Sequence, residues 1–465
     1  MRVRSVPSLW LEQKGRRLDC GPYLSGAIEA KVLLEKLPVR KAPLHEVTQG
    51  GMAGIFNGPR FSRTYVDDPG YGIPFLGSTD ILAADLSWLP LISKKQVVTL
   101  PELIIEEGWT LITCSGTIGR MAYARPEMVG MAGSQHFMRV VPDPDKILPG
   151  YLYAYLSSRF GMPLVVGGTY GAIIQHIEPH HIADLPVPLF GDEIAATVHR
   201  KIDEAARLRD EYQSQVREAT RLFFSAVGLK DITSAEWHQQ GVDLGFAPNM
   251  SSPTSLRALN FNPRFKRLCD KIKAGPWKPL GEICQPGTLQ RGGRYKRIDA
   301  EAEFGYQLIG QRQLFWQKPE GRSVAKFAIG PEAFVEAGTT LVAAQGTLGE
   351  SELYCRSEFI WGPAVSLAYS EHMLRVVTNK VVMPGGCLFA FMRSEMAFRM
   401  LRSISMGSKL QDHHYTFLPN LLVPYPNQIA QQEIHELIVD AYDKKHRSNA
   451  LEAEATRLVE QAIDN

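Results

Sequence analysis

Two short runs of the sequence place arginines, glycines and an aromatic ring close together, as a contact with nucleic acid would require. Gly58-Pro-Arg-Phe-Ser-Arg63 is followed by Tyr65, and Gln290-Arg-Gly-Gly-Arg-Tyr-Lys-Arg297 holds four cations in eight residues. Lys and Arg contact phosphates, and Arg or Gln can read base edges through two hydrogen bonds. A solvated loop is the alternative for each residue. The DNA-binding candidates in these runs are Arg60, Arg63, Tyr65, Arg291, Arg294, Tyr295 and Lys296.

Two further pairs of segments could also meet DNA. Ser115-Gly-Thr-Ile-Gly119 and Gln345-Gly-Thr-Leu-Gly349 each follow a strand-like run, and their glycines allow positive φ and a close approach of the backbone. A tight hairpin is the structural alternative. Segments 168–176 and 407–413 occupy matching positions before the last strand of each half. The candidates here are Ser115, Thr117, Arg120, Tyr170, Gln175 and His176 in the first half, and Arg312, Gln345, Thr347, Lys409, Gln411 and His413 in the second.

Sequence patterns for catalysis are weak throughout the chain. It contains no GxxxxGK[ST] loop and no GxGxxG after a strand, and Asn262-Pro-Arg-Phe265 lacks the second proline of a DNA-amine methylation loop. Histidines cluster at 176–181 and 413–414 without a nearby cysteine, which disfavours a metal site. Asp19, Glu29 and Lys31 resemble the carboxylate pair and lysine of a nuclease site, but this pattern is too permissive to identify one. We therefore expect no catalytic residue, metal or cofactor in this chain.

Composition sets the class of protein. The 465 residues are 45% hydrophobic and 22% charged, with a net charge of +2, so any nucleic-acid binding must come from local basic patches. No apolar run approaches the ~18 residues of a spanning helix, and no membrane contact is expected. Six scattered cysteines without a CxxC pair favour a reduced, cytoplasmic setting.

The chain is an internal duplication. Shifted by about 236 residues, it partly matches itself from Pro43–Val47 against Pro279–Ile283 to Glu218–Leu222 against Glu454–Leu458. The shift grows from 230 at the glycine motif to 236 at Arg139-Val-Val and Arg375-Val-Val, which predicts an insertion of about six residues between Gly349 and Arg375. Because the matches keep their order along the chain, chance similarity is a poor explanation.

Each copy ends in a long predicted helix, 192–226 and 428–463. Apolar residues recur at a mean spacing of about 3.5, the period of a coiled-coil seam. Lys445 and Ser448 interrupt the second seam. We expect the two helices to pair with each other, the alternative being that each packs only on its own domain. The helix-pairing candidates are Val198, Ile202, Leu208, Val216, Leu222, Ile434, Ile438, Leu451 and Leu458.

This ordered set of features resembles the specificity subunit of type I restriction–modification systems. The resemblance is carried by the two Gly-Thr-Ile/Leu-Gly turns, by the segments leading into Leu185-Pro-Val-Pro188 and Leu421-Leu-Val-Pro424, and by the helix that follows each. The openings at Arg17–Tyr23 and Arg257–Pro263 also look like module starts of this family. The usual Pro-Pro-Leu-x-Glu-Gln after the last strand is replaced by Pro188–Glu193 and Pro424–Gln428, which leaves the contacts at the helix starts open.

The resemblance implies an α+β fold with two duplicated target-recognition domains of mixed α/β structure, separated by two long antiparallel coiled-coil helices. The expected parts are an N-terminal segment (1–37), domain one (38–190), a central spacer helix (191–227), a linker and start of the second module (228–274), domain two (275–426) and a distal spacer helix (427–465).

By the same resemblance, the chain is a non-catalytic subunit that reads a bipartite double-stranded DNA target. It would bind two DNA-adenine methyltransferase subunits, which hold S-adenosylmethionine, and a translocating nuclease or another defence effector could join them. Two other classes stay open from the residues alone: a standalone nuclease, and an adaptor whose β-rich domains bind protein in a defence complex.

Overall fold

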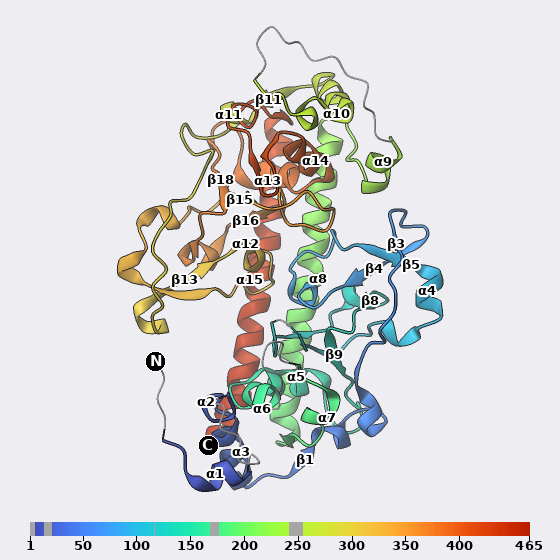
Figure 1. Cartoon of the computed structure of the whole chain (residues 1–465), viewed down its shortest axis with the longest axis vertical. Coiled ribbons are helices and arrows are strands. Elements are labelled where there is room, and N and C mark those ends of the chain that lie inside the picture. Colours follow the sequence, from blue (N-terminus) through green and yellow to red (C-terminus); the bar gives the residue numbers. More distant parts are fainter. Residues whose placement is uncertain (1–4, 14–20, 116, 168–175, 241–253) are drawn as a thin grey trace. The chain divides into compact units, whose positions relative to one another are not determined.

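The computed structural model describes residues 5–13, 21–115, 117–167, 176–240 and 254–465. It divides into two units (Figure 1): unit 1 is Met1–Asp210 with Arg447–Asn465, and unit 2 is Glu211–His446. The division falls inside both long helices, so each unit contains a part of each. Among the helices of the described residues, none is both long enough and apolar enough to span a membrane.

Unit 1 is built on two four-stranded sheets and a strand pair. The first sheet has the antiparallel order β2 (Ile55–Asn57), β9 (Phe137–Val140), β6 (Thr110–Thr113) and β7 (Met121–Tyr123). The second has the order β3 (Tyr65–Val66), β5 (Leu91–Ser93), β4 (Gly72–Leu76) and β8 (Ala132–Gly133), with β4 and β8 parallel. β1 (Lys41–Pro43) pairs with β10 (Pro186–Pro188). The helices are α1 (Ser8–Gln13), α2 (Gly21–Leu24), α3 (Ala27–Lys36), α4 (Lys94–Val98), α5 (Pro149–Ser157), α6 (Gly161–Gly167) and α7 (Pro179–Ile182).

Unit 2 repeats this plan. Its first sheet has the order β12 (Gln290–Arg291), β18 (Met373–Val376), β15 (Thr340–Ala343) and β16 (Ser357–Phe359). A second sheet joins β14 (Arg322–Ala325), β13 (Gly305–Ile309) and β17 (Ala368–Tyr369), and β11 (Trp277–Pro279) pairs with β21 (Leu422–Pro424). β19 (Ser405–Gly407) and β20 (Gln411–His413) form a further hairpin. The shorter helices are α9 (Ser234–Gln239), α10 (Pro263–Lys273), α11 (Leu280–Ile283), α12 (Gln311–Leu314), α13 (Gly385–Met392) and α14 (Glu395–Ser403).

The strand registers confirm the internal repeat. Leu111 lies opposite Arg139 in unit 1, and Leu341 lies opposite Arg375 in unit 2. The predicted insertion is also found: residues 114–120 connect β6 to β7, whereas residues 344–356 connect β15 to β16, so the second connection is six residues longer. Arg402 supports this longer loop by donating to the carbonyl oxygens of Leu348 (2.8 Å) and Gly349 (2.9 Å).

The long helices α8 (Asp192–Ala226) and α15 (Gln428–Asp464) lie as the heptad pattern predicts. In unit 1, Val198, Ile202 and Ala206 of α8 share one apolar cluster with Ala455, Val459 and Ile463 of α15. The same cluster contains Tyr151–Leu156 of α5, so the helix pair is continuous with the core of the domain. Leu208 and Leu451 form a second contact with Ala205. The helices therefore pair with each other in unit 1, and the alternative that each packs only on its own domain does not hold there.

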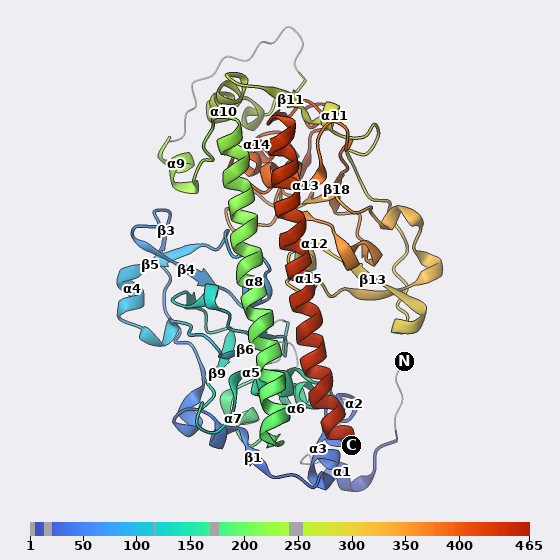
Figure 2. The ribbon, with the colours of Figure 1, turned by 180° about the vertical axis from the view of Figure 1, so that it is seen from behind.

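In unit 2 the remaining parts of the helices also pair (Figure 2). The rings of Tyr212 and Tyr442 meet edge to face at 5.3 Å, and Gln215 donates to Asp440 at 2.6 Å. The partner's residue number falls as the number in α8 rises, so the helices are antiparallel. Phe223 is fully buried and stacks on Phe391, whereas Leu222 is only half-buried. The seam position expected at Leu222 is thus filled by its neighbour, because the helix also packs on α13.

The lysine that interrupts the second seam is buried in an ion pair. Lys445 donates to Glu358 of β16 at 2.6 Å, and the two side chains are 4% and 5% exposed. The Lys445 ammonium also lies 5.5 Å from the Tyr212 ring and 5.2 Å from the Tyr442 ring. The Lys445 ammonium, which interrupts the apolar pattern, is thus stabilised by the Glu358 carboxylate and by two aromatic rings.

Removing one member of this pair should destabilise unit 2 more than removing both. Lys445→Met removes the ammonium that faces the buried Glu358 carboxylate, and we expect it to cost about 3–5 kcal/mol of unfolding free energy. Adding Glu358→Leu should restore most of that loss, because no buried charge remains. Urea unfolding of the two single variants and the double variant measures the coupling; equal and additive losses would contradict the pairing.

A charge placed in the seam of unit 1 should break the helix contact. Leu208 is 8% exposed, and Leu208→Glu would bury a carboxylate among Ala205 and Leu451 without a partner. We expect a loss of about 3 kcal/mol or more, measured by thermal unfolding. Arg200→Glu on the exposed face of the same helix is the matched control and should change stability little. Similar melting of both variants would rule out a buried seam at this position.

Candidate nucleic-acid interface

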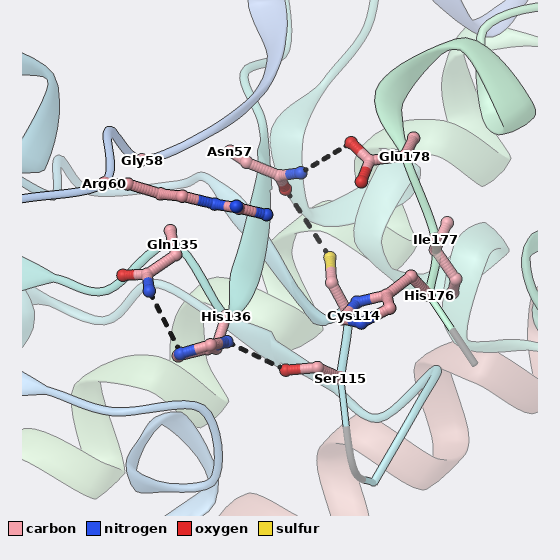
Figure 3. Close-up of a pocket in the computed structure, with 10 residues that line it drawn as sticks. All are labelled: Asn57, Gly58, Arg60, Cys114, Ser115, Gln135, His136, His176, Ile177 and Glu178. Atoms are coloured by element: carbon pink, nitrogen blue, oxygen red, sulfur yellow. Dashed lines mark hydrogen bonds between the residues drawn. The ribbon is translucent and has the colours of Figure 1, made fainter. Parts of the chain in front are cut away.

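Unit 1 contains a pocket of about 430 Å³ at one end of its first sheet (Figure 3). Its walls come from four places in the chain: the end of β2 with the basic loop after it, the end of β6, the residues before β9, and the segment after position 175. The lining residues are Asn57, Gly58, Arg60, Cys114, Ser115, Gln135, His136, His176, Ile177 and Glu178.

Backbone hydrogen bonds hold these segments together. The amide of Cys114 donates to the carbonyl of His136 (2.9 Å), and the amide of Ile177 donates to the carbonyl of Cys114 (3.4 Å). Ser115 and His176 form an isolated antiparallel bridge. The Gly-Thr-Ile-Gly turn and the segment ending at His176, which the sequence predicted as separate recognition elements, therefore meet in one place.

A chain of side-chain hydrogen bonds orients the polar groups of the pocket. Ser115 Oγ lies 3.0 Å from His136 Nδ1, and Gln135 Nε2 lies 3.1 Å from His136 Nε2. Arg63 donates to Gln135 Oε1 at 3.0 Å. On the opposite wall, Asn57 donates to Glu178 Oε2 at 3.2 Å (Figure 3). Such mutual bonding holds amides and an imidazole in defined orientations, as base-edge readout requires.

The electrostatics of the pocket suit an anionic partner. Burial lowers the pKa of His136, and the nearby Arg63, His176 and Arg60 lower it further. Burial and the neighbouring positive charges thus both favour the neutral imidazole of His136. Burial raises the pKa of the Cys114 thiol to about 12, so this cysteine is protonated and unsuited to nucleophilic attack. The arrangement can bind and position an anionic partner.

Beneath the pocket lies a fully buried arginine. Arg139 donates to the carbonyl oxygens of Gly133 (2.8 Å), Ser134 (3.1 Å) and Phe137 (3.1 Å), and burial lowers its pKa to about 10. A Cβ at Gly58 would lie 2.9 Å from its Nη1, so a larger residue there would displace the guanidinium. The first glycine of the basic loop thus makes room for a structural guanidinium.

Unit 2 assembles its corresponding segments in the same way. The amide of Ala344 donates to the carbonyl of His372 (2.9 Å), and Gly346 forms an isolated bridge with Gln411. Arg291 pairs with Asp412 and donates through Nε to the carbonyl of Glu371 (3.1 Å). The second Gly-Thr turn and the second recognition segment therefore also meet.

Several predicted residues are placed where they cannot face DNA without rearrangement. Gln411 and His413 are 3% and 7% exposed, and His413 lies 3.4 Å from Cys355 Sγ. Tyr295 is half-buried and its hydroxyl donates to the carbonyl of Tyr369, so its ring anchors the loop. Gln345 differs from these residues, because only its backbone amide and carbonyl exchange hydrogen bonds with the side chain of Gln311. The exposed candidates of unit 2 are Arg294, Lys296, Arg312 and Lys409.

In unit 1, the hairpin alternative applies to the glycine turn. The carbonyls of Thr117 and Arg120 both accept from Thr113, and Gly119 has φ +80° with Val166 packed against its Cα. Arg120 is half-buried and burial lowers its pKa, whereas Tyr65 is 54% exposed. Tyr170 and Gln175 lie outside the described residues, as does Asp19 of the nuclease alternative. Among the described residues, no three His, Cys, Asp or Glu could together hold a metal ion.

Asn57, Gln135, His136 and Glu178 line the pocket although the sequence patterns do not predict them. One signal was available, because Gln135-His136 and Glu371-His372 stand three residues before the repeated Arg-Val-Val strand in both copies. Asn57 and Glu178 carry no comparable signal, since only the fold brings them within hydrogen-bonding distance.

Three comparisons place the chain among known proteins. The family model for the type I restriction modification DNA specificity domain matches residues 43–189, which include the whole pocket. No curated protein matches the chain. Among solved structures, it is similar to the type I restriction-modification S subunit from M. genitalium, at 10% identity over 92% of this chain and 96% of that chain, with a TM-score of 0.34. It is also similar to the HsdS subunit from Thermoanaerobacter tengcongensis, at 14% identity over 92% and 97%, with a TM-score of 0.28.

The buried histidine of β20 should make unit 2 sensitive to acid. Burial, aided by the nearby Arg291, lowers the pKa of His413 to about 4, against about 6.5 in an unfolded chain. Stability is therefore complete above about pH 6.5 and falls towards pH 4, by about 1.4 kcal/mol per pH unit for this group. Urea unfolding at several pH values measures how the free energy of unfolding changes with pH. His413→Gln should lose the contribution of this group to that pH dependence, whereas His180→Gln, at an exposed histidine, should retain it. An unchanged slope in His413→Gln would show that the group titrates normally.

Proposed function

We propose that the chain reads a DNA target made of two half-sites, because residues 43–189 match the family model for the type I restriction modification DNA specificity domain. Proteins of this family supply sequence recognition and do no chemistry themselves, so the standalone nuclease and the protein-binding adaptor are not favoured.

One observation carries the bipartite proposal: the plan of the matched domain occurs twice. The first sheet of unit 2 has the same strand order and the same register between its central strands as the first sheet of unit 1. The residues that meet at the end of each first sheet differ, with Asn57, Ser115 and Gln135 in unit 1 and Arg291, Gln345 and Glu371 in unit 2. Two similar frames with different polar groups favour recognition of two different base sequences.

The binding mode follows from the chemistry of the exposed groups. Arg and Lys side chains on loops contact phosphates and give most of the affinity, while amides and guanidinium groups discriminate base edges. Arg60 and Arg294 are exposed beside groups that are held by hydrogen bonds. Each unit would therefore grip one half-site through its cations and read it through its oriented polar groups.

The complex proposed around this chain contains two DNA-adenine methyltransferase subunits. They would bind S-adenosylmethionine and flip the target adenine from the stack, so this chain needs neither a cofactor nor a base-flipping pocket. A translocating nuclease or another defence effector could join the same complex, in the cytoplasm. Helices α8 and α15, each of which contributes to both units, would fix the unread spacer between the half-sites.

Methylation mapping tests the two-half-site proposal. The complex of this chain with its methyltransferase subunits should methylate one motif, formed by two short specific sequences around a spacer of fixed length and free sequence. Single-molecule sequencing of DNA from cells that carry the complex reads this directly. A motif without a spacer, or methylation without sequence preference, would contradict the proposal. Catalytically inactive methyltransferase in the same cells supplies the background.

A further inference from the structure

The two basic loops are copies of one motif. Gly58-Pro-Arg60-Phe-Ser-Arg63 and Gly292-Gly-Arg294-Tyr-Lys-Arg297 share the pattern Gly-x-Arg-aromatic-x-Arg at a spacing of 234 residues. The strand registers place them identically, because Phe56 lies opposite Arg139 and Gln290 lies opposite Arg375. The loops therefore begin at the same point of the same sheet in both units.

The fold explains three of the four shared positions. The glycine leaves room for the arginine beneath it, since a Cβ at Gly292 would lie 2.0 Å from Arg375 Nη1 and a Cβ at Gly58 would lie 2.9 Å from Arg139 Nη1. The aromatic ring packs on the second sheet, through Phe61 against Phe75 and through Tyr295 in the cluster around Leu308.

The last arginine holds the residue before the repeated histidine. Arg63 donates to Gln135 at 3.0 Å, and Arg297 donates to Glu371 at 3.0 and 3.1 Å. Gln135 and Glu371 occupy the same place in the two copies, so this contact is also part of the common frame.

The fourth position, Arg60 and Arg294, has no such role. Both side chains are exposed, and within the described part of the chain neither makes a hydrogen bond or an ion pair. Arg60 extends along the wall of the pocket of unit 1 (Figure 3). Because the fold does not explain why an exposed arginine stands at equivalent positions of the two domains, we look for its role in contact with a partner.

The residue before the glycine occupies the same place in both copies, but its chemistry differs. It is Asn57 in unit 1 and Arg291 in unit 2. Asn57 donates to Glu178, and Arg291 pairs with Asp412. His176 and Gln411 are the residues that form bridges with the two Gly-Thr turns. Glu178 lies two residues after His176, and Asp412 lies one residue after Gln411.

The hydrogen-bonding capacity at this position differs in kind. An amide can pair with adenine and a guanidinium with guanine. The Arg291 side chain is 22% exposed, and its second Nη makes no hydrogen bond with the described residues.

The phosphate backbone is the same in every half-site, whereas the base edges differ. We propose that Arg60 and Arg294 make equivalent phosphate contacts, and that Asn57 and Arg291 are the equivalent residues by which the two units prefer different bases. This assignment rests on the proposed function and divides the candidate residues by their role within it.

Exchange at the variable position tests the specificity assignment. In the complex with methyltransferase, Arg291→Asn should change the accepted bases in one half of the methylated motif and leave the other half intact, and Asn57→Ser should affect only the other half. Because Arg291→Asn releases Asp412, thermal unfolding is measured alongside, and Asp412→Asn tests the carboxylate alone while keeping the arginine. An unchanged motif in the folded, DNA-binding Arg291→Asn complex would overturn the assignment.

Removal of the repeated cation tests the phosphate assignment. Arg60→Ala and Arg294→Ala should each weaken binding to target and non-target duplexes by the same factor and lower the slope of log affinity against log salt by about 1. The methylated motif should be unchanged. Lys36→Ala, an exposed cation on α3, is the charge-matched control and should leave the slope as it is.

A changed motif, or a loss confined to target DNA, would overturn the phosphate role. If the wild-type complex itself bound DNA without sequence preference, the proposed function would fail together with this assignment, which separates the two outcomes.

Discussion

The structure depends on the pairing of two long helices that cannot bury their apolar seams alone. In each unit, part of α8 lies antiparallel to part of α15, and the shared seam continues into the core of the domain. Both seams also contain a buried cation at corresponding positions of the repeat, Arg209 and Lys445. Arg209 pairs with Glu452 of the partner helix, whereas Lys445 pairs with Glu358 of a strand. The first pair thus joins the two helices directly, and the second joins α15 to the sheet of unit 2.

On this foundation, each unit separates a constant frame from variable surface groups. The buried Arg139 and its half-buried counterpart Arg375, the glycine above each, and the anchored aromatic ring recur in both copies and fix where the basic loop leaves the sheet. The polar groups at the mouth of that frame differ between copies. A rigid, repeated support with exchangeable side chains is a suitable arrangement for reading two DNA sequences, because orientation is set by the frame and preference by the side chain.

Much of the site could be predicted from the residues, and the failures have a common cause. Arg60, Ser115 and His176 were chosen for their types and do line one pocket. Gln411 and His413 were chosen for the same reason and are buried. A β-strand directs alternate side chains to opposite faces, and a sequence without a known register does not say which face meets solvent. His136 was overlooked because it reads as the start of a strand, although its position recurs as His372.

The sequence by itself determined the duplication, the insertion between the paired strands, the two heptad helices and the absence of a recognisable catalytic motif, because these are properties of order and period along the chain. The tertiary structure decided which side chains meet. It brought the Gly-Thr turns beside segments about 60 residues away, buried two of the predicted base readers, and gave Lys445 a carboxylate from a distant strand. Such contacts join residues whose separation in sequence carries no trace of their proximity, so only the packed chain could reveal them.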